Sequence, residues 1–310
     1  MKLEGIHHIT AITSDAQENI DFYAGVLGLR LVKKTVNQDD PSVYHLFFAD
    51  ENGSAGADLT FFEFPGAPIG RAGDGMVHEI AWRVASEEAL DFWEERLKAR
   101  DVETKRGERT LVFRDPEGLQ HVLRISSVDD DALIADHPEV PRELALRGFD
   151  GVRAFSSAPE ASAGLLRELG FEEGSDRFSD HAWEARGESR GGTIVYDPPP
   201  AERGLQGAGT VHHVAWGSVP AEHEAWRERV SAGGAHPTPV IDRFYFQSIY
   251  FREPSGVLFE IATRSPGFTV DEPLEHLGEK LSIPPFLENR RPEIEQIVRP
   301  LENPRVAARS

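Results

Sequence analysis

The sequence predicts an α+β fold built from four βαβββ modules, because one pattern of residues recurs along the chain. Residues 77–82 (VHEIAW) and 211–216 (VHHVAW) are near copies, and so are residues 113–118 (FRDPEG) and 251–256 (FREPSG). These copies mark the two ends of windows of similar length. Each window begins with a short apolar strand, continues with an amphipathic helix and ends with three strands separated by turn residues. The sequence therefore predicts a duplicated module.

Weaker copies of the opening motif extend the repeat over most of the chain. They begin at residues 5–10 (GIHHIT) and 148–153 (GFDGVR). The last segment of the chain, which is mixed polar and apolar, is expected to pack over the edge of a module rather than carry chemistry. The alternative is a solvated, partly disordered tail. We expect modules at residues 1–65, 75–127, 145–198 and 209–265, followed by a C-terminal tail at residues 266–310.

One helix is expected in each module. Ser14 with Gln17 resembles a capping box, Gly28 suits a left-handed helix stop, and Pro220 suits the start of the fourth helix. Apolar residues at helical spacing predict the buried faces. In module order these are Ile20, Tyr23, Val26 and Leu27; Leu90, Trp93 and Leu97; Leu165, Leu166 and Leu169; and Trp226 and Val230.

The composition of the 310 residues excludes several classes of protein. Lys and Arg number 33 against 53 Asp and Glu, and the net charge of -20 disfavours nucleic acid and anionic membranes as partners. The absence of Cys excludes disulfides and thiolate chemistry, so that a metal must be held by His and carboxylates. Neither a membrane-length apolar run nor a secretory signal is present, which predicts a cytoplasmic protein. The composition does not decide whether the protein forms a homo-oligomer.

Alignment of the modules on their shared ends places candidate metal ligands in modules one and four. Module four offers His213 on its first strand and Glu260 on its last, and module one offers His8 on its first strand. Thr60 falls at the fourth ligand position that the repeat predicts, and its side chain is too short to fill that position. Two His and one carboxylate are typical of non-haem iron(II), which keeps other positions for substrate and O2. The equivalent residues in modules two and three are Glu79, Val122 and Gly151.

Strand alternation helps to choose between the residues of each His-His pair. Neighbours on a strand point to opposite faces, so at most one His of each pair can bind the metal. His8 shares its face with Thr10, whereas His7 and His212 share theirs with apolar residues. This pattern favours His8 and His213.

Glu260 lies inside the apolar strand formed by residues 257–262 (VLFEIA). A carboxylate in such a strand needs a cation or a dense set of hydrogen bonds to offset several kcal/mol of desolvation. A metal ion would meet this need. The alternative is an ion pair with Arg264 or Arg252.

The repeat and its His-rich stretches resemble the vicinal oxygen chelate superfamily, in which βαβββ modules pair so that their mixed sheets form cup-shaped domains around a divalent metal. The resemblance covers nearly the whole chain. It is carried by residues 7–10 (HHIT), 44–50 (YHLFFAD), 212–213 (HH) and 243–263. More narrowly, the chain resembles ring-cleaving dioxygenases that open hydroquinones and chlorinated hydroquinones. This resemblance implies Fe(II), with Mn(II) or another divalent metal as the alternative, and a small aromatic diol and O2 as substrates.

The resemblance also implies roles around the metal for Thr10, His7, His212, Arg243 and Tyr250. Tyr250 would donate a hydrogen bond to an oxygen of the reacting species, Arg243 would bind a phenolate oxygen, and His212 or His7 would shuttle a proton. The structural alternatives are cross-strand packing for Tyr250 and an ion pair of Arg243 with Asp242 or another nearby acid.

The remaining aromatic and His residues divide into two groups. Some of the Phe residues are candidate walls of the cup, although strand alternation lets only some of them face inward. These are Phe47, Phe61, Phe62, Phe244, Phe246 and Phe259. The other His residues are interpreted as structural or surface residues, with His45 the doubtful case. They are His45, His78, His121, His137, His181, His223, His236 and His276.

Two other functions remain open on this scaffold. A glyoxalase-like isomerase or lyase uses four ligands including two carboxylates, which would require Glu63 or Asp58 at the corner assigned to Thr60. A non-catalytic protein that binds a small molecule would need no open coordination site. The sequence supplies one carboxylate to the candidate site, which disfavours the isomerase, and the retention of three candidate ligands disfavours the binding protein.

Overall fold

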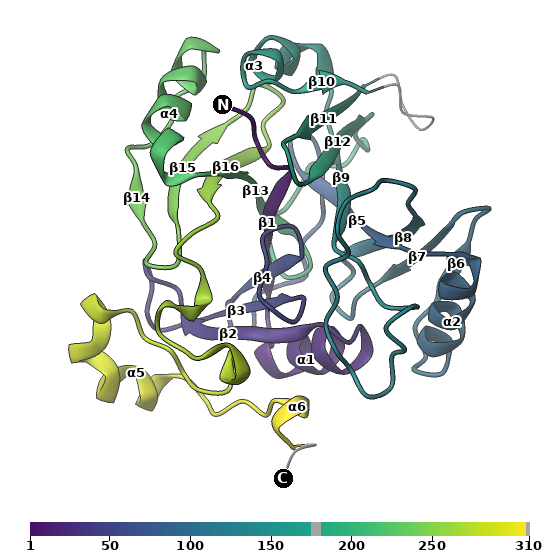
Figure 1. Ribbon diagram of the computed structural model, residues 1–310, viewed down its shortest axis with the longest axis vertical. Coiled ribbons are helices and arrows are strands. Elements are labelled where there is room, and N and C mark those ends of the chain that lie inside the picture. The colour runs from purple at the N-terminus through teal and green to yellow at the C-terminus, as the bar shows by residue number, and fades with distance from the viewer. Residues whose placement is uncertain (175–180, 308–310) are drawn as a thin grey trace.

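The computed structural model describes residues 1–174 and 181–307, and it contains two eight-stranded mixed sheets with helices packed against them (Figure 1). The first module comprises β1 (Ile6–Thr13), α1 (Ala16–Ile20), a π-helical continuation (Asp21–Val26), β2 (Arg30–Val36), β3 (Tyr44–Ala49) and β4 (Asp58–Glu63). The second comprises β5 (Val77–Val84), α2 (Glu87–Lys98), β6 (Thr104–Arg106), β7 (Thr110–Arg114) and β8 (Gln120–Ile125).

The second half of the chain repeats this order of elements. The third module comprises β9 (Phe149–Phe155), α3 (Ala163–Glu168), β10 (Glu172–Glu173), β11 (Ala182–Arg186) and β12 (Gly191–Asp197). The fourth comprises β13 (Val211–Ser218), α4 (His223–Ala232), β14 (Ile241–Asp242), β15 (Gln247–Arg252) and β16 (Leu258–Thr263). Two short helices follow, α5 (Arg291–Ile297) and α6 (Pro304–Ala307). The predicted α+β fold of four βαβββ modules in two mixed-sheet domains is confirmed.

The modules pair in an order that the sequence left partly open. One sheet has the strand order β14-β15-β16-β13-β1-β4-β3-β2 and therefore joins module four to module one. The other has the order β10-β11-β12-β9-β5-β8-β7-β6 and joins module three to module two. The first strands of the two modules meet antiparallel at the centre of each sheet. Residues far apart in the chain thereby become neighbours.

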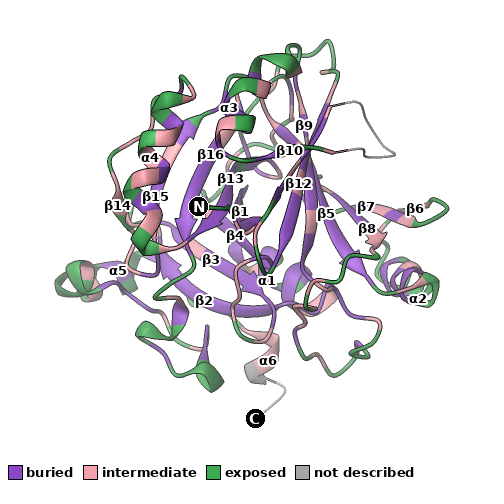
Figure 2. Ribbon diagram, turned by 45° about the horizontal axis from the view of Figure 1, so that its top comes forward, coloured by how far each residue is buried: buried purple, intermediate pink, exposed green. Residues whose placement is uncertain are grey.

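The apolar core lies between the sheets and the helices that cover them. The strands are buried along most of their length, and exposed residues lie mainly on helices and loops (Figure 2). Trp216 of β13 and Trp226 of α4 are fully buried, and Trp216 contacts Phe259 of β16 with ring centroids 5.5 Å apart. The predicted apolar stripe of the fourth helix therefore faces the sheet.

The start of α1 differs from the predicted capping box. Asp15 is the N-cap, because its carboxylate accepts hydrogen bonds from the backbone N–H groups of Gln17 and Glu18. Ser14 instead donates its hydroxyl to Glu117 Oε1 at 2.6 Å, from the turn of module two. The Ser14 side chain, which the local pattern assigned to the helix cap, therefore forms a contact with another module. Gly28 has a φ of 70°, as its predicted stop position requires.

A buried polar network joins the first and second modules. The Tyr23 hydroxyl donates to Asp115 Oδ2 at 2.8 Å and accepts a hydrogen bond from His121 Nε2 at 2.9 Å. Trp82 Nε1 donates to His121 Nδ1 at 3.1 Å, which leaves His121 neutral with its proton on Nε2. Burial lowers the pKa of His121 to about 3, consistent with the neutral ring.

The tail lies along β2, the outer strand of its sheet (Figure 1). Leu281 forms a parallel bridge with Lys34, and Ser282 N donates to the Lys34 carbonyl at 2.9 Å. Lys33 is fully buried, and its ammonium group contacts Asp271 Oδ1 at 2.7 Å and the Glu272 carboxylate. The last three residues of the tail, 308–310, lie outside the described residues.

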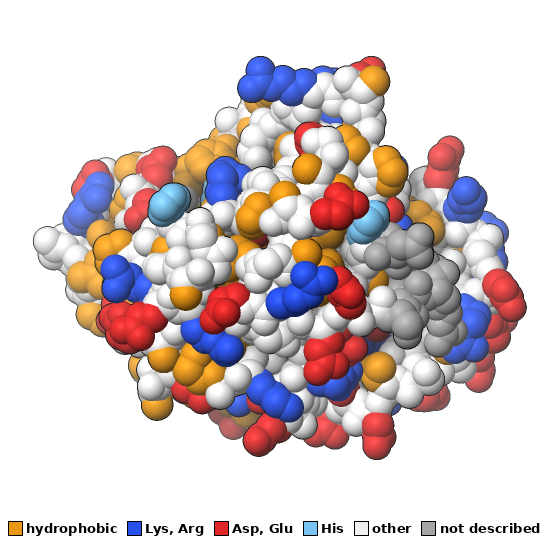
Figure 3. Space-filling model, turned by 90° about the horizontal axis from the view of Figure 1, so that it is seen from above, with side chains coloured by type: hydrophobic (Ala, Val, Ile, Leu, Met, Phe, Trp, Pro, Cys, Tyr) orange, Lys and Arg blue, Asp and Glu red, His pale blue; other side chains and the backbone are white. Residues whose placement is uncertain are grey.

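Charged residues of both signs lie on the surface. Acidic and basic side chains are interspersed on the face seen in Figure 3. Within the described part of the chain, no helix combines the length and the apolar character needed to cross a bilayer.

Candidate metal centre

Three buried side chains from distant parts of the chain converge in the sheet of modules one and four. His8 Nε2 and His213 Nε2 lie 3.1 and 2.9 Å from Glu260 Oε2, and the two imidazole nitrogens lie 3.3 Å apart. All three residues are at most 4% exposed. These are the three residues that the alignment of the modules selected as candidate ligands.

The register of three strands produces this convergence. His8 of β1 lies opposite Ala215 of β13, and Ala215 lies beside Glu260 of β16. His213 precedes Ala215 by two residues and therefore points to the same face of the sheet. The cluster forms where the antiparallel pair of first strands meets the last strand of module four.

The donor set and its spacing fit a divalent metal. In an octahedral site with bonds of about 2.1 Å, adjacent ligand atoms lie about 3 Å apart, close to the distances among these atoms. Neither imidazole is aligned to donate a hydrogen bond to Glu260, whose two carboxylate oxygens have no hydrogen-bond donor in the described structure. A buried carboxylate without donors is unfavourable unless a cation binds it.

The alternative in which an Arg neutralises Glu260 is wrong. Arg264 contacts Ser189 and Glu4, and Arg252 donates to the Gly256 carbonyl. In residues 1–174 and 181–307, only the two imidazoles lie within ion-pair distance of Glu260. Burial alone would raise the pKa of Glu260, whereas protonated His8 and His213 rings beside it would hold the pKa well below its ordinary value.

The neighbour of His8 sets the tautomer of that ring. His7 Nε2 lies 3.2 Å from the Thr263 carbonyl oxygen, which can only accept, so Nε2 carries the proton. Burial lowers the pKa of His7 to about 3, and the neutral ring keeps Nδ1 free to accept. His8 Nδ1 lies 2.9 Å away and must donate to it. The lone pair of His8 is therefore on Nε2 and faces Glu260, as metal binding requires.

The second His-His pair has the same local geometry. His212 Nδ1 lies 2.8 Å from His213 Nδ1, which leaves His213 Nε2 facing the cluster. His212 itself is exposed and does not line the pocket beside the cluster. The structure thus places His7 and His212 behind the two candidate ligands, in contact with their Nδ1 atoms.

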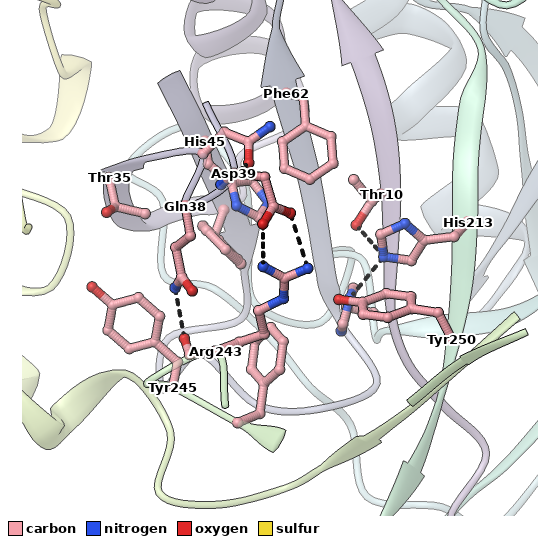
Figure 4. A pocket seen from close by; sticks show the side chains of 14 residues that line it. Thr10, Thr35, Gln38, Asp39, His45, Phe62, His213, Arg243, Tyr245 and Tyr250 are labelled. Carbon is pink, nitrogen blue, oxygen red and sulfur yellow. Dashed lines mark hydrogen bonds and ion pairs between the residues drawn. The ribbon is translucent and has the colours of Figure 1, made fainter. Parts of the chain in front are cut away.

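A pocket of about 440 Å³, including its open mouth, lies beside the cluster. Thr10, His213 and Tyr250 lie on one side, and Gln38, Asp39 and Tyr245 lie on the other (Figure 4). The remaining lining residues are His8, Thr35, Asn37, His45, Phe47, Phe62, Arg243 and Phe246. The pocket is therefore partly aromatic and opens onto the candidate ligands.

Three of the six Phe residues considered as walls line this pocket, namely Phe47, Phe62 and Phe246. The other three do not. Phe61 lies on the opposite face of β4, where it contacts Tyr23 with ring centroids 4.7 Å apart, and Phe259 packs in the core. Phe244 packs beside Tyr245. Strand alternation accounts for Phe61 and Phe259.

Arg243 reaches into the pocket and pairs with an acid that the sequence did not identify. Its guanidinium lies 3.0 Å from Asp39, whereas Asp242 accepts a hydrogen bond from the Phe244 backbone N–H. The guanidinium also lies over the ring of Tyr250, 5.5 Å from the ring centre. Burial would lower the pKa of Arg243, but Tyr250 and Asp39 outweigh it, so that the group stays charged.

His45 is a pocket residue rather than a structural or surface residue. Its ring lies beside Phe47 and Phe62, and its Nε2 lies 2.9 Å from Thr60 Oγ1. Alternation along β3 was the available signal, because His45 shares a face with Phe47. Asp39 and Gln38 had no comparable signal, since they lie in a loop that only the tertiary structure places over the pocket.

The fold and this centre identify the class of protein. The profile of the Glyoxalase/Bleomycin resistance protein/Dioxygenase superfamily matches residues 5–122. The chain is also 43% identical to a Bacillus subtilis protein named "Putative ring-cleaving dioxygenase MhqO", with 97% of each chain covered. The chain belongs to this superfamily.

Three further proteins are similar to this chain in sequence or in structure. The chain is 33% identical to "Chlorohydroquinone/hydroquinone 1,2-dioxygenase" of Sphingobium indicum, with 94% of this chain and 95% of the relative covered. A crystal structure of a Bacillus subtilis protein described as a "putative dioxygenase" superposes with a TM-score of 0.90 and 42% identity, covering 97% of this chain and 98% of that one. Glyoxalase I of Zea mays shares the fold, with a TM-score of 0.60, 15% identity and coverage of 89% and 97%.

Proposed function

We propose that this protein is a ring-cleaving dioxygenase that uses Fe(II), or another divalent metal such as Mn(II), to open a hydroquinone or catechol-type ring by extradiol-type cleavage. The observation that carries the proposal is the convergence of His8, His213 and Glu260 beside a partly aromatic pocket. Relatives over nearly the whole chain are named ring-cleaving dioxygenases, and one of them is named for hydroquinone and chlorohydroquinone. The proposed substrates are therefore a small aromatic diol and O2.

The residue at the fourth ligand position, Thr60, favours an oxygenase over an isomerase. Thr60 contacts Thr10, and Thr10 in turn contacts His213, so that a hydroxyl lies where the isomerase would need a second carboxylate. Glu63 accepts a hydrogen bond from the Ala16 backbone N–H at the start of α1. Asp58 is buried but is not part of the ligand cluster found among the described residues. Three protein ligands leave positions open for the diol and O2.

A divalent iron held by His8, His213 and Glu260 would supply the electronic link between the diol and O2. Arg243 would bind one phenolate oxygen, because it is a charged donor inside the pocket. Burial and Glu260 raise the pKa of Tyr250 well above its ordinary value, so that its hydroxyl remains a hydrogen-bond donor at neutral pH. Tyr250 would stabilise negative charge that develops on oxygen in the pocket.

The other proposed site residues act on the ligands or at the edge of the pocket. His7 and His212 would hold the candidate ligand rings in the orientation that exposes Nε2. Thr10 would contact the bound diol, since its hydroxyl lies 2.9 Å from His213 Nε2. Phe47, which lines the pocket, would exclude water from one side of the ring.

Metal analysis combined with oxygen uptake tests the proposal. The protein is purified without oxygen, its metals are quantified, and O2 consumption is followed with hydroquinone, chlorohydroquinone and catechol. The expected result is about one iron per chain and consumption of one O2 per ring opened. Bound nickel or zinc with activity on a thiol adduct would favour the isomerase, and absence of metal and of O2 uptake would favour a non-catalytic binding protein.

A further inference from the structure

A chain of hydrogen bonds crosses four neighbouring strands beside the candidate metal centre. Thr10 Oγ1 lies 2.9 Å from His213 Nε2 and 2.9 Å from Thr60 Oγ1, which lies 2.9 Å from His45 Nε2. The residues come from β13, β1, β4 and β3, which are adjacent in this order. Thr10 is paired in register with both His213 and Thr60, so the sheet itself aligns the chain.

The far end of this chain is an imidazole enclosed by aromatic rings. The ring centroid of His45 lies 4.0 Å from that of Phe47 and 4.3 Å from that of Phe62. Both Phe rings line the pocket together with His45, which is half-buried. The two Phe rings are tilted against the imidazole by 38° and 44°, and Nε2 is the nitrogen that contacts Thr60.

The environment of His45 keeps it neutral. Burial lowers its pKa well below the ordinary value, and positive charge on His8 or His213 would lower it further. The charged and titratable groups that act on it from other strands and loops are His8, His213, Arg243 and Glu260. A neutral imidazole can accept a proton from Thr60 at Nε2 while it gives up another from Nδ1. The low pKa disfavours the protonated ring, so that His45 would pass a proton on rather than keep it.

Metal binding would change the partner of Thr10. His213 Nε2 has one lone pair, and a metal ion would occupy it, so that the Thr10 hydroxyl loses its present contact. The hydroxyl would then be available to a ligand in the pocket. A Thr hydroxyl both donates and accepts, which allows Thr10 and Thr60 to pass a proton along the chain.

We propose that His45 accepts the proton released when a phenolic ligand binds at the metal, through Thr10 and Thr60. The inference rests on the proposed function and names the proton acceptor that it requires. The phenolic O–H bond breaks, its electron pair stays on the oxygen, and the proton passes to Thr10 Oγ1. The Thr10 proton moves to Thr60, the Thr60 proton moves to His45 Nε2, and His45 releases a proton to solvent from Nδ1. No electrons are transferred.

A purely structural role for the same hydrogen bonds predicts different behaviour. In that case the chain only satisfies buried hydroxyl groups, and its loss would change stability but not the rate at which a bound phenol ionises. The two roles are separated by a measurement of phenol ionisation in the metal-loaded protein without oxygen, where no ring cleavage takes place. Nitrohydroquinone is a suitable probe, because its visible absorption moves to longer wavelength when it ionises.

The variants are His45→Gln, Thr60→Val and the matched control Thr60→Ser. Gln can still contact Thr60 but cannot take up a proton, Val keeps the shape of Thr without the hydroxyl, and Ser keeps the hydroxyl. In stopped-flow mixing we expect the phenolate absorption to appear about 100-fold more slowly in H45Q and T60V, and at the native rate in T60S. Metal content and circular dichroism report whether each variant is folded and loaded. In a fourth variant, His45→Gly, the side chain is absent, and added imidazole should restore the rate.

The outcomes distinguish this inference from the proposed function. If H45Q ionises the probe at the native rate, or if only T60V is slowed, the proposed role of His45 is wrong. Oxygen uptake by the native protein would in that case still support the proposed dioxygenase activity. If the native protein ionises the probe but consumes no oxygen, the proposed ring cleavage is wrong. Slow ionisation in H45Q would in that case still support the proton path. A native protein that never ionises the probe would overturn the path itself.

Discussion

The guanidinium of Arg243 and the carboxylate of Asp39 form an ion pair across the pocket, with nitrogen–oxygen distances of 3.0 and 3.1 Å (Figure 4). Asp39 lies in the loop between β2 and β3, whereas Arg243 directly follows β14, so the pair links the first and fourth modules. Gln38 adds a hydrogen bond to the Arg243 carbonyl at 2.7 Å. A phenolate that binds to Arg243 must therefore compete with Asp39.

Asp39→Asn should tighten the binding of an anionic ligand. The Asp39 side chain is 73% exposed, so the pair is screened by water and contributes at most about 1 kcal/mol. We expect the Kd of nitrohydroquinone to fall about two- to fivefold above the pKa of the probe, with little change below it. Asp40→Asn is the matched control in the same loop. Weaker binding by Asp39→Asn would indicate that the pair holds Arg243 in place rather than competing with the ligand.

Glu260→Gln should abolish metal binding while the protein remains folded. The substitution removes the charge of this candidate ligand but preserves the volume of the side chain. Because loss of a group that merely supports a ligand weakens metal affinity 10- to 100-fold, we expect loss of the ligand to exceed about 100-fold. Metal quantification after dialysis and far-ultraviolet circular dichroism measure the two effects. The exposed Glu228→Gln is the control, and native metal content in Glu260→Gln would remove Glu260 from the centre.

Lys33→Met should release the tail from β2. Lys33 is fully buried against Asp271 and Glu272, and its loss would leave the buried Glu272 carboxylate without its cation. Removal of one partner of a buried ion pair typically costs about 3–5 kcal/mol. Urea unfolding measures this loss, and Lys280→Met, at an exposed position of the same tail, should change stability by less than about 0.5 kcal/mol. Equal stability of the two variants would contradict tail docking by Lys33.

Asp115 should make the stability depend on pH between about 4 and 6. Burial raises the pKa of Asp115 from 3.8 to about 6, although hydrogen bonds from Tyr23 and the backbone oppose the shift. The folded protein therefore holds this proton at pH values where the unfolded chain has lost it, and the free energy of unfolding falls as pH rises through this window. The full contribution is about 3 kcal/mol.

Asp115→Asn lacks this titration and provides the comparison. We expect the difference in stability between the native protein and Asp115→Asn, measured by urea unfolding at several pH values, to move in favour of the variant as pH rises from 4 to 7. A difference that stays constant over this range would show that Asp115 does not hold a proton in the folded state. The exposed Asp91→Asn serves as the control.

Local patterns were sufficient for much of the fold. The repeated motifs predicted the order of strands and helices, and the stripe containing Trp226 predicted a buried helix face. Local patterns failed where another module supplied the partner. Ser14 matched a capping box, but Glu117 from module two bonds to it and Asp15 caps the helix instead.

The candidate centre shows the same division. The repeat selected His8, His213 and Glu260, because equivalent positions in duplicated modules can be compared without coordinates. It could not identify Asp39 or the role of His45 in the pocket, since a loop or a strand face acquires its neighbours only when the sheet is assembled.

The sequence alone determined the module, its fourfold recurrence and the residue types available to bind a metal, because these depend on periodicity and side-chain chemistry. Only the tertiary structure decided that module two pairs with module three, that Asp39 opposes Arg243, and that Thr10, Thr60 and His45 form one hydrogen-bonded row. The physical reason is that strand register and loop placement result from packing across the whole sheet, and no local segment encodes them.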